Sequence, residues 1–368
     1  MIKNINQAVP LFSNNQLKLI TNKFLNELHN AVKENSSSIS YLTNPPPSSI
    51  IHNDEIFQVM IVGGSVFEKT LVQKKGKNIN ILQLIKSHVP VFDSKNTFLD
   101  FIYQNTDLSV QYVAINFTYP IRPVFENNLL DGVLIKATKE HSFKGLIDKI
   151  IGKEISQYVK QKSGENILFT LANDTICLLL AGINKDHSFI AGGIIGTGIN
   201  FGFYNKKEFV NLESGNFNGF PQTKTGLQID KESNNPNYQL FEKEVSGQYL
   251  YKHFNVITKQ IKDNISLSST SQLNDFALGK NGVNTLIAQR LFERSASLVA
   301  CQIAGTYHHL NQVQLTFVME GSIFWTGWNY KKMVEEHLVL LGIPQNTVRF
   351  IKIEHSNILG AAKLVCGI

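Results

Sequence analysis

The chain has 368 residues, of which 43% are hydrophobic and 17% charged, with 35 lysines and arginines against 29 aspartates and glutamates. A chain of this length and apolar content can bury large cores, which favours two domains over one. Because the formal net charge of +6 is spread widely, we expect no nucleic-acid partner, although diffuse positive charge would suit a small anionic substrate.

The sequence also indicates how the chain relates to membranes and to the redox state of its compartment. No apolar run reaches the length of a membrane span and no signal peptide opens the sequence, so we expect no membrane association. The three cysteines, Cys177, Cys301 and Cys366, stand beside apolar neighbours without CxxC spacing. Such residues are typical of buried free thiols in a reducing compartment, so we expect a cytoplasmic protein and assign no metal ligand.

The first elements are a helix, a linker and three strands. Apolar residues over 15–33 recur as in an amphipathic helix, and the proline-rich run 35–49 reads as a stiff linker. Strands at 57–63, 66–72 and 79–85 form a meander, in which Lys74–Lys77 supplies a solvated hairpin turn. A helix at 98–103, strands at 112–117 and 133–137, and a helix at 147–161 follow.

The turn Gly63-Gly64-Ser65 joins the first two strands of this meander. Glycines allow backbone N–H groups to approach a phosphate closely, and Ser65 offers a hydroxyl. An ordinary hairpin turn would explain the same residues, and the local sequence leaves both interpretations open.

The central stretch 167–183 predicts a buried strand that ends at Ala172, followed by a helix after Asn173-Asp174. In α/β folds, ligands bind beyond the carboxyl ends of such strands. Asp174 could accept a proton from a substrate hydroxyl there, while the Asn173 amide holds a sugar-like partner. The two residues would also serve simply as a helix cap.

The second half repeats the first. Strands are expected at 189–195, 200–204 and 208–212, with the turn Gly196-Thr197-Gly198 between the first two. Two such meanders predict a duplicated domain with a ligand cleft between the copies. Residues 221–238 read as a loop. We expect helices at 242–254, 284–310 and 331–341, strands at 313–319 and 348–353, and a last helix from 360.

Several short segments, in order, resemble motifs of the hexokinase and glucokinase family. They are Phe117-Thr118-Tyr119-Pro120 (FSFP), Thr138-Lys139 (TKG), Leu171-Ala172-Asn173-Asp174-Thr175 (LVNDT), Gly196-Thr197-Gly198-Ile199-Asn200 (GTGTN), Asn211-Leu212-Glu213-Ser214-Gly215 (NTEWG), and Asn235-Pro236 with Phe241-Glu242-Lys243 (NPG…FEK). The match runs from the helix near Phe24 to Ala362. The chain resembles a shortened member, trimmed mostly between 255 and 284.

The resemblance implies a fold of the actin-like ATPase superfamily. This is an α/β fold of two ribonuclease-H-like domains with an interdomain cleft. We expect a large domain of 1–54 plus 174–355 and a small domain of 55–173 plus 356–368. The N-terminal helix should pack with the second half, and the segment after Ser356 should return to the first domain. We expect a monomer or homodimer.

The resemblance also implies an ATP:hexose 6-phosphotransferase with ATP and Mg²⁺ as cofactors and glucose as the first hexose to test, a reaction that opens glycolysis. Asp174 would be the general base and Lys139 would add positive charge. Hexose contacts would come from Thr118, Thr138, Lys139, Asn173, Asp174, Asn200, Glu213 and Glu242. Nucleotide contacts would come from Gly63, Gly64, Ser65, Gly196, Thr197, Gly198, Gly321, Ser322, Ser356 and Gly360.

Departures from the family lie mostly on the nucleotide side. The family's first phosphate segment reads DLGGTNFR, and here Ile61 replaces the aspartate that organises magnesium and Glu68 replaces the arginine. Ser214 stands where the family has tryptophan. The alternative function is therefore a catalytically weak or inactive hexokinase-like sugar sensor. A kinase for another sugar, or one that uses another phosphoryl donor, is a remoter possibility.

Overall fold

The computed structural model describes residues 1–368 except 1, 65, 137–140, 184–188, 264 and 281, and the side chains of residues 2–4 are also left out. The chain divides into two compact units. Unit 1 comprises Met1–Tyr41, Ala191–Phe201 and Leu212–Lys352, and unit 2 comprises Leu42–Ile190, Gly202–Asn211 and Ile353–Ile368. The domain boundaries expected from the sequence stay a prediction.

Unit 2 is built on a five-stranded sheet in the order β4-β3-β2-β5-β8. Its strands are β2 (Ile56–Val62), β3 (Val66–Lys75), β4 (Asn78–His88), β5 (Tyr112–Phe117) and β8 (Leu168–Asn173). The antiparallel pairs β2–β3 and β3–β4 confirm the first predicted meander. The pairs β2–β5 and β5–β8 are parallel, so their carboxyl ends share one edge of the sheet.

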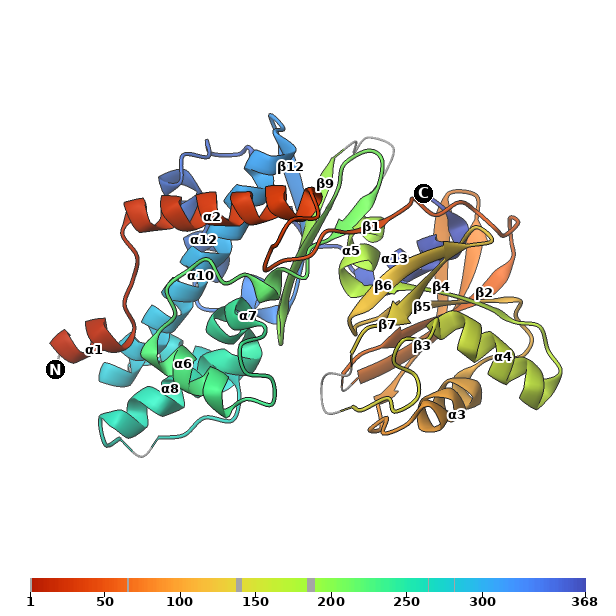
Figure 1. Ribbon diagram of the computed structural model, residues 1–368, viewed down its shortest axis with the longest axis horizontal. Helices are drawn as coiled ribbons and strands as arrows, with labels where there is room; N and C mark the ends of the chain where they lie inside the picture. The colour runs from red at the N-terminus through yellow and green to blue at the C-terminus, as the bar shows by residue number, and fades with distance from the viewer. Residues whose placement is uncertain (1, 65, 137–140, 184–188, 264, 281) are drawn as a thin grey trace. The chain divides into compact units, whose positions relative to one another are not determined.

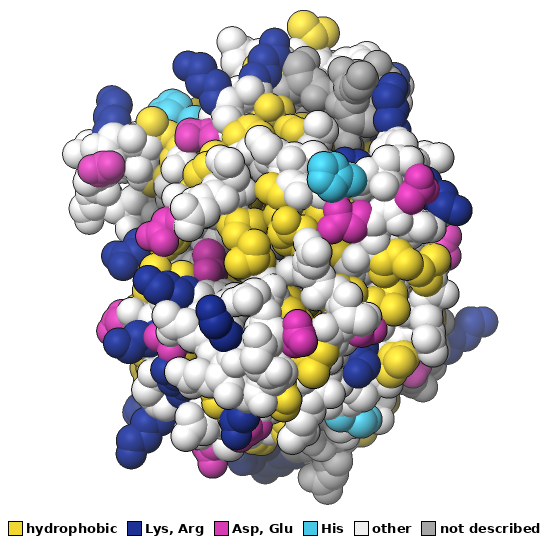
Figure 2. All heavy atoms as spheres, turned by 90° about the vertical axis from the view of Figure 1, so that its right-hand side faces the viewer, with side chains coloured by type: hydrophobic (Ala, Val, Ile, Leu, Met, Phe, Trp, Pro, Cys, Tyr) yellow, Lys and Arg dark blue, Asp and Glu magenta, His cyan; other side chains and the backbone are white. Residues whose placement is uncertain are grey.

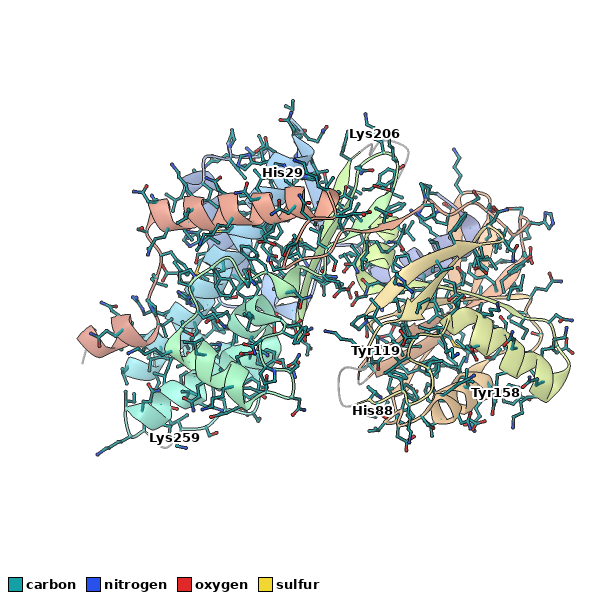
Figure 3. The ribbon with its side chains drawn as sticks, viewed as in Figure 1. His29, His88, Tyr119, Tyr158, Lys206 and Lys259 are labelled. Atoms are coloured by element: carbon teal, nitrogen blue, oxygen red, sulfur yellow. The ribbon has the colours of Figure 1, made fainter. Side chains whose placement is uncertain are left out.

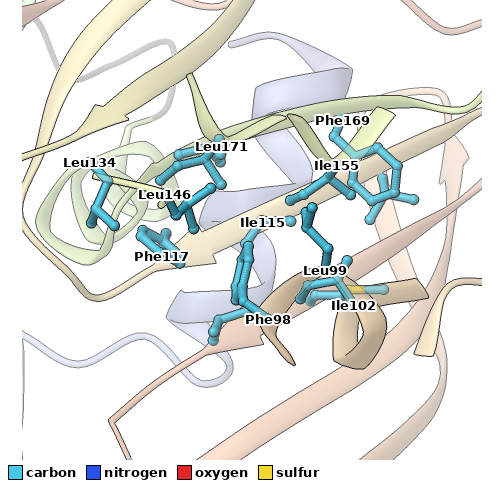
Figure 4. Close-up of a cluster of buried hydrophobic side chains, with 14 of the residues drawn as sticks. Phe98, Leu99, Ile102, Ile115, Phe117, Leu134, Leu146, Ile155, Phe169 and Leu171 are labelled. Atoms are coloured by element: carbon cyan, nitrogen blue, oxygen red, sulfur yellow. The ribbon is translucent and has the colours of Figure 1, made fainter. Parts of the chain in front are cut away.

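One face of this sheet packs against helices α3 (Lys95–Asn105) and α4 (Ile151–Ser163) over a core of buried aliphatic and aromatic side chains (Figures 1 and 4). The C-terminal helix α13 (Ser356–Cys366) belongs to the same unit and packs on β5, β2 and α5 (Asp174–Gly182). A Cβ atom at Gly360 would lie 1.8 Å from the carbonyl oxygen of Cys177, so α13 crosses α5 at backbone contact. The expected return of the C-terminus to the first sheet is confirmed.

The hairpin of β6 (Ile121–Glu126) and β7 (Leu129–Leu134) was not predicted, since the strand expected at 133–137 overlaps only the end of β7 and its last residue lies outside the described residues. Its two-residue turn places Asn127 and Asn128 at φ 53° and 63°. Asparagine tolerates this left-handed backbone, and two such residues in succession form the turn that best matches the twist of a hairpin. The strand β6 was missed because Pro123 interrupts its strand pattern.

The second sheet has the order β1-β11-β10-β9-β12-β13. Its strands are β1 (Leu42–Asn44), β9 (Ile190–Ile195), β10 (Ile199–Tyr204), β11 (Phe209–Asn211), β12 (Leu315–Glu320) and β13 (Val348–Ile351). The second predicted meander is confirmed by β9, β10 and β11. Apart from the short edge strand β1, the order third–second–first–fourth–fifth strand is the same as in the first sheet.

Helices make up most of the rest of unit 1. They are α1 (Ile2–Ala8), α2 (Asn14–Val32), α6 (Lys224–Glu232), α7 (Leu240–Val245), α8 (Gly247–Gln260), α9 (Thr270–Leu278), α10 (Val283–Leu310), α11 (Ser322–Thr326) and α12 (Tyr330–Leu340), with the 3₁₀ turn η1 (Ser214–Asn216). The N-terminal helix α2 packs on α10, where a Cβ atom at Gly305 would lie 2.6 Å from Phe24. This confirms that the N-terminal helix packs with the second half.

Two predictions for the segment 221–254 are wrong. The expected loop at 221–238 contains α6, which begins at the cap residue Thr223. The single expected helix at 242–254 is two helices, α7 and α8, because Ser246 is extended and the Gly247 N–H donates to the carbonyl oxygen of Gly196 at 2.8 Å. Helices α9 and α11 had not been predicted at all.

Candidate active site

The predicted base lies at the carboxyl edge of the unit 2 sheet. Val62 on β2 pairs with Phe117 on β5, and Phe117 pairs with Asn173 on β8. Three neighbouring strands therefore end in register. The residues that follow them, Gly63, Thr118 and Asp174, emerge at the same edge, which is where α/β sheets bind ligands.

Asn173 and Asp174 have different local roles at this edge. Asn173 is the N-cap residue of α5, and its side-chain oxygen accepts from the Thr175 N–H at 3.0 Å. Asp174 is the first helical residue, and its carboxylate also lies 2.8 Å from the Thr175 nitrogen. Asn173 is 6% exposed, whereas Asp174 is partly exposed. The cap is thus provided by Asn173, and the capping interpretation does not account for the aspartate beside it.

A second group of predicted residues gathers in unit 1 around the Gly196-Thr197-Gly198 turn. The carbonyl oxygens of Gly196 and Thr197 accept from the first N–H groups of α8. A Cβ atom at Gly196 would lie 3.4 Å from the Cα of Gly321. Gly321 has φ 105°, and its Cβ would lie 2.2 Å from the Ile195 carbonyl oxygen, so only glycine fits there. The two predicted glycine turns of unit 1 are neighbours.

The predicted sugar-binding residues of unit 1 lie beside this turn. The Asn200 side-chain oxygen accepts from the Ser214 N–H at 3.0 Å, which ties β10 to the segment that carries Glu213. The Glu242 carboxylate accepts from the Ile199 N–H at 3.1 Å. A Cβ atom at Gly198 would lie 2.6 Å from that carboxylate, so a larger residue there would displace the Glu242 side chain from its present position. The Asn200 and Glu242 side chains and the segment that carries Glu213 are thus linked in one framework.

The residues that hold Glu242 in place were missed by the sequence reasoning. Lys243 is fully buried, and its ammonium lies 2.6 Å from Asp230 and 2.8 Å from the Asn235 carbonyl oxygen. Glu244 accepts from the Thr223 N–H at 2.6 Å and pairs with Arg294 at 3.5 Å. The two side chains that follow Glu242 in the sequence are therefore anchored in the interior. A charged FEK segment was the available signal, but it does not reveal the partners.

The pKa of the nearby Tyr249 is shifted by burial and by the negative charge in this part of unit 1. Burial, with a contribution from the negative charge of Glu242, raises the pKa of Tyr249 to about 12. The phenol therefore stays neutral at physiological pH beside the carboxylate.

Other residues singled out in the sequence lie on α13 and on β2. Ser356 is buried at the first turn of α13, and Gly360 lies at the α13–α5 crossing, where the close backbone contact already requires glycine. Ile61 is 7% exposed and pairs in the sheet with Glu68, whose carboxylate lies 2.7 Å from Lys86. Ser65, Thr138 and Lys139 lie outside the described residues.

Within the described ranges, no three His, Cys, Asp or Glu side chains are grouped to hold a metal. None of the helices described combines the length and hydropathy of a membrane span. Basic side chains lie among acidic ones on the face in Figure 2. Cys177, Cys301 and Cys366 are free thiols.

Known proteins that resemble this chain in sequence or in fold include several hexokinases. The family model for hexokinase matches residues 190–284 and 267–366. Hexokinase-7 of Oryza sativa subsp. japonica is 26% identical over 267 residues, covering 63% of this chain and 56% of the relative. The chain spans about half the length of the curated relatives it matches.

Two solved structures cover nearly the whole chain. A crystal structure of a hexokinase has a TM-score of 0.79 at 18% identity and covers 99% of this chain and 98% of its own. A hexokinase from Schistosoma mansoni complexed with glucose has a TM-score of 0.76 at 17% identity, with 99% of each chain covered. These likenesses establish the fold.

Two sheets of repeated strand order, each followed at its carboxyl edge by glycine turns and polar side chains, define an α/β protein of the two-domain actin-like ATPase fold. Within that class, residues 190–366 match the hexokinase family model, and the curated relatives in sequence are hexokinases.

Proposed function

We propose that this protein is a hexokinase-type sugar kinase that transfers the γ-phosphoryl group of ATP to the 6-hydroxyl of a hexose, with glucose as the first candidate. The observation that carries the proposal is the register of Val62, Phe117 and Asn173, which brings Asp174 to the same sheet edge as the glycine turn and Thr118. A carboxylate at such an edge is suited to remove a proton from a substrate hydroxyl.

In the proposed reaction, a carboxylate oxygen of Asp174 takes the proton of the 6-hydroxyl. The sugar 6-oxygen forms a bond to the γ-phosphorus as the bond from that phosphorus to the bridging oxygen of ATP breaks, and ADP leaves. Asn200, Glu213 and Glu242 offer acceptors for the other sugar hydroxyls, which donate well to carboxylates. We propose that Lys139 adds positive charge near the transferring group.

The glycine turns support ATP as the donor. In unit 1, a Cβ atom at Gly321 would lie 2.7 Å from the Gly196 nitrogen, so the two turns meet at backbone contact. Close backbone approach of this kind is typical of turns that bind phosphate. The same class of contact is proposed for Gly63 and Gly64 in unit 2. The roles proposed for Ser65, Thr197, Gly198, Ser322, Ser356 and Gly360 in nucleotide binding rest on the family resemblance.

The described residues do not fit a protein-held Mg²⁺. Ile61 offers an alkyl chain where a carboxylate would be needed, and Glu68 is paired with Lys86. Mg²⁺ commonly keeps several waters and is held largely by substrate phosphates. We therefore propose that any Mg²⁺ enters with ATP, and no step of the mechanism relies on a protein ligand to it.

The alkyl side chain of Ile61 also favours a second candidate function, a sugar-binding sensor with little or no turnover. The chain retains Asn200, Glu213 and Glu242 for the sugar but lacks the metal-organising carboxylate at position 61. A reducing, cytoplasmic setting remains a proposal that rests on the free thiols.

Replacement of the base tests the proposal. Turnover is measured in a coupled assay with glucose, mannose, fructose and N-acetylglucosamine, with and without Mg²⁺ and ATP. Asp174→Ala and Asp174→Asn should each lower kcat at least about a hundredfold, the usual scale for loss of a general base, while glucose binding stays measurable by calorimetry. The exposed Asp275→Asn serves as the matched control. Unchanged turnover in either Asp174 variant would remove this residue from the mechanism.

A further inference from the structure

The turn between β2 and β3 is held by two aromatic side chains from other parts of unit 2. The Tyr119 hydroxyl, just beyond β5 (Figure 3), donates to the carbonyl oxygen of Gly63 at 2.8 Å. The His141 Nε2 atom lies 3.2 Å from the carbonyl oxygen of Gly64. Tyr119 is fully buried and His141 is 7% exposed. Both donor side chains are therefore buried, whereas the two glycines that they bind are partly exposed.

The direction of the His141 bond follows from its other nitrogen. The Phe92 N–H donates to His141 Nδ1 at 2.9 Å. A ring nitrogen that accepts a hydrogen bond carries no proton, so the proton of the neutral imidazole lies on Nε2 and is donated to Gly64. The ring stacks on Phe143 at a centroid distance of 5.5 Å and contacts Phe92 at 5.1 Å. Its orientation is therefore fixed by packing as well as by hydrogen bonds.

The backbone carbonyl groups of Val62, Gly63 and Gly64 each accept a hydrogen bond from another residue of unit 2. The Val62 carbonyl accepts from the Thr118 N–H at 3.2 Å, and the next two accept from Tyr119 and His141. In a trans peptide, the C=O and the following N–H point in opposite directions. The Gly64 N–H therefore points away from Tyr119. The Gly63 N–H is already used, since it donates to the Val66 carbonyl oxygen at 3.0 Å. The turn therefore presents the Gly64 N–H to an anion.

We propose that Tyr119 and His141 are positioning residues that hold the Gly63–Gly64 turn in the conformation that receives a nucleotide phosphate. The inference rests on the proposed nucleotide site and adds two residues to it. In the FSFP segment that Phe117–Pro120 resembles, the third residue is phenylalanine, which has the ring but no hydroxyl. Tyr119 therefore supplies this chain with a tether to Gly63 that the family motif lacks.

Tyr119→Phe removes only the hydroxyl. The dissociation constant for ATP should rise about three- to tenfold, the scale of one lost hydrogen bond, whereas those for adenosine and glucose should not change. Tyr330→Phe is the matched control, because Tyr330 is also buried and its hydroxyl bonds to Ser295 at 2.7 Å in unit 1. Calorimetry measures all three ligands, and a melting curve accompanies each variant.

Two substitutions of His141 separate its two bonds. In His141→Gln the amide nitrogen reaches the position of Nε2, so donation to Gly64 is kept. In His141→Asn the amide reaches only the position of Nδ1, so that bond is lost. We expect the asparagine variant to weaken ATP binding and to speed amide hydrogen exchange at 63–66, and the glutamine variant to restore both.

The outcomes separate this inference from the proposed function. ATP affinity that is unchanged in both Tyr119→Phe and His141→Asn, or a loss shared equally by ATP, adenosine and glucose, would overturn the positioning role while leaving kinase activity intact. A wild-type protein that binds ATP without turnover, and loses ATP affinity in these variants, would refute the kinase and uphold the inference. A wild-type protein that binds glucose but no nucleotide would overturn the inference.

Discussion

Asp131 on β7 shows how one side chain sets the start of a helix that lies elsewhere in the chain. Its carboxylate accepts from the N–H groups of Gly152 at 2.8 Å and Lys153 at 3.1 Å, the first residues of α4, and from the N–H of Gly132. Burial outweighs these bonds and raises the pKa of Asp131 to about 6. The folded protein therefore takes up a proton more readily at this position than the unfolded chain.

The stability contributed by Asp131 should depend on pH. A raised pKa means that the contribution is fully present below about pH 4 and is lost as pH rises through about 6. Asp131→Asn, which stays neutral, should therefore gain in melting temperature relative to wild type between about pH 4 and 7. Melting curves across this range measure the difference, and exposed Asp148→Asn controls for the lost charge. A difference that does not vary with pH would contradict the shifted pKa.

Sequence reasoning could place candidate residues at this scale but could not find their partners. Asp174 after a buried strand and Glu242 in a charged segment are visible as local patterns. The bond from Tyr119 to Gly63 joins residues that are far apart in the sequence, and the one from Asn200 to Ser214 depends on how two segments meet. Neither follows from periodicity or composition, since each requires the register of the sheet to be known first.

At the scale of elements, α7 is short and depends on buried ions. Lys243 is fully buried and its ammonium is held by Asp230 on α6, by Ser233 and by the Asn235 carbonyl oxygen. A buried ammonium is tolerated only with such a complete set of partners. Because Glu242 immediately precedes Lys243, the position of its carboxylate depends on this anchoring.

Removing the lysine should be costly. Lys243→Met leaves the Asp230 carboxylate buried without its ion partner and should lower the free energy of unfolding by about 3–5 kcal/mol. Hexose affinity should fall as well, because α7 carries Glu242. Adding Asp230→Asn should recover part of the stability, and the exposed Lys231→Met provides the control. Urea unfolding and glucose calorimetry measure both effects, and additive losses in the double variant would show that the pair is not coupled.

The same network explains why α6 escaped prediction. Its buried face includes Thr225, Gly226 and Asp230 beside a single large apolar residue, Ile229. Hydrophobic periodicity detects a helix by its apolar stripe, and a helix that buries polar groups against an ion pair has none to show. The strands of the two meanders and the long helix α10, which bury many apolar side chains, were predicted with nearly correct limits.

At the scale of the whole molecule, the repeated strand order accounts for the distribution of the predicted residues. Each unit contributes a glycine turn after its first meander strand, at Gly63 in unit 2 and at Gly196 in unit 1. The proposed base Asp174 belongs to unit 2, and Asn200 and Glu242 belong to unit 1. The duplication was visible in the sequence because both meanders keep their turns and apolar runs.

Ligand-linked stability should distinguish a kinase from a sensor in the intact chain. A hexose that binds the folded protein stabilises it by about 2.7 kcal/mol at a hundredfold excess over its Kd, so glucose should raise the melting temperature in either case. For a kinase, glucose with Mg²⁺ and ATP should yield sugar phosphate. EDTA should abolish that turnover but leave the glucose-dependent rise in melting temperature. The reason is that, among the described residues, no three His, Cys, Asp or Glu side chains are grouped to hold a metal.

The sensor makes the opposite prediction for turnover and the same one for the sugar. The glucose-dependent shift would persist, and no sugar phosphate would form at any Mg²⁺ concentration, because Ile61 offers no ligand and Glu68 is neutralised by Lys86. Ordinary turnover at low free Mg²⁺ would show that ATP and water hold the metal adequately without a carboxylate at position 61. The absence of any shift with glucose, mannose, fructose or N-acetylglucosamine would contradict both functions, since each requires the sugar to bind the folded state.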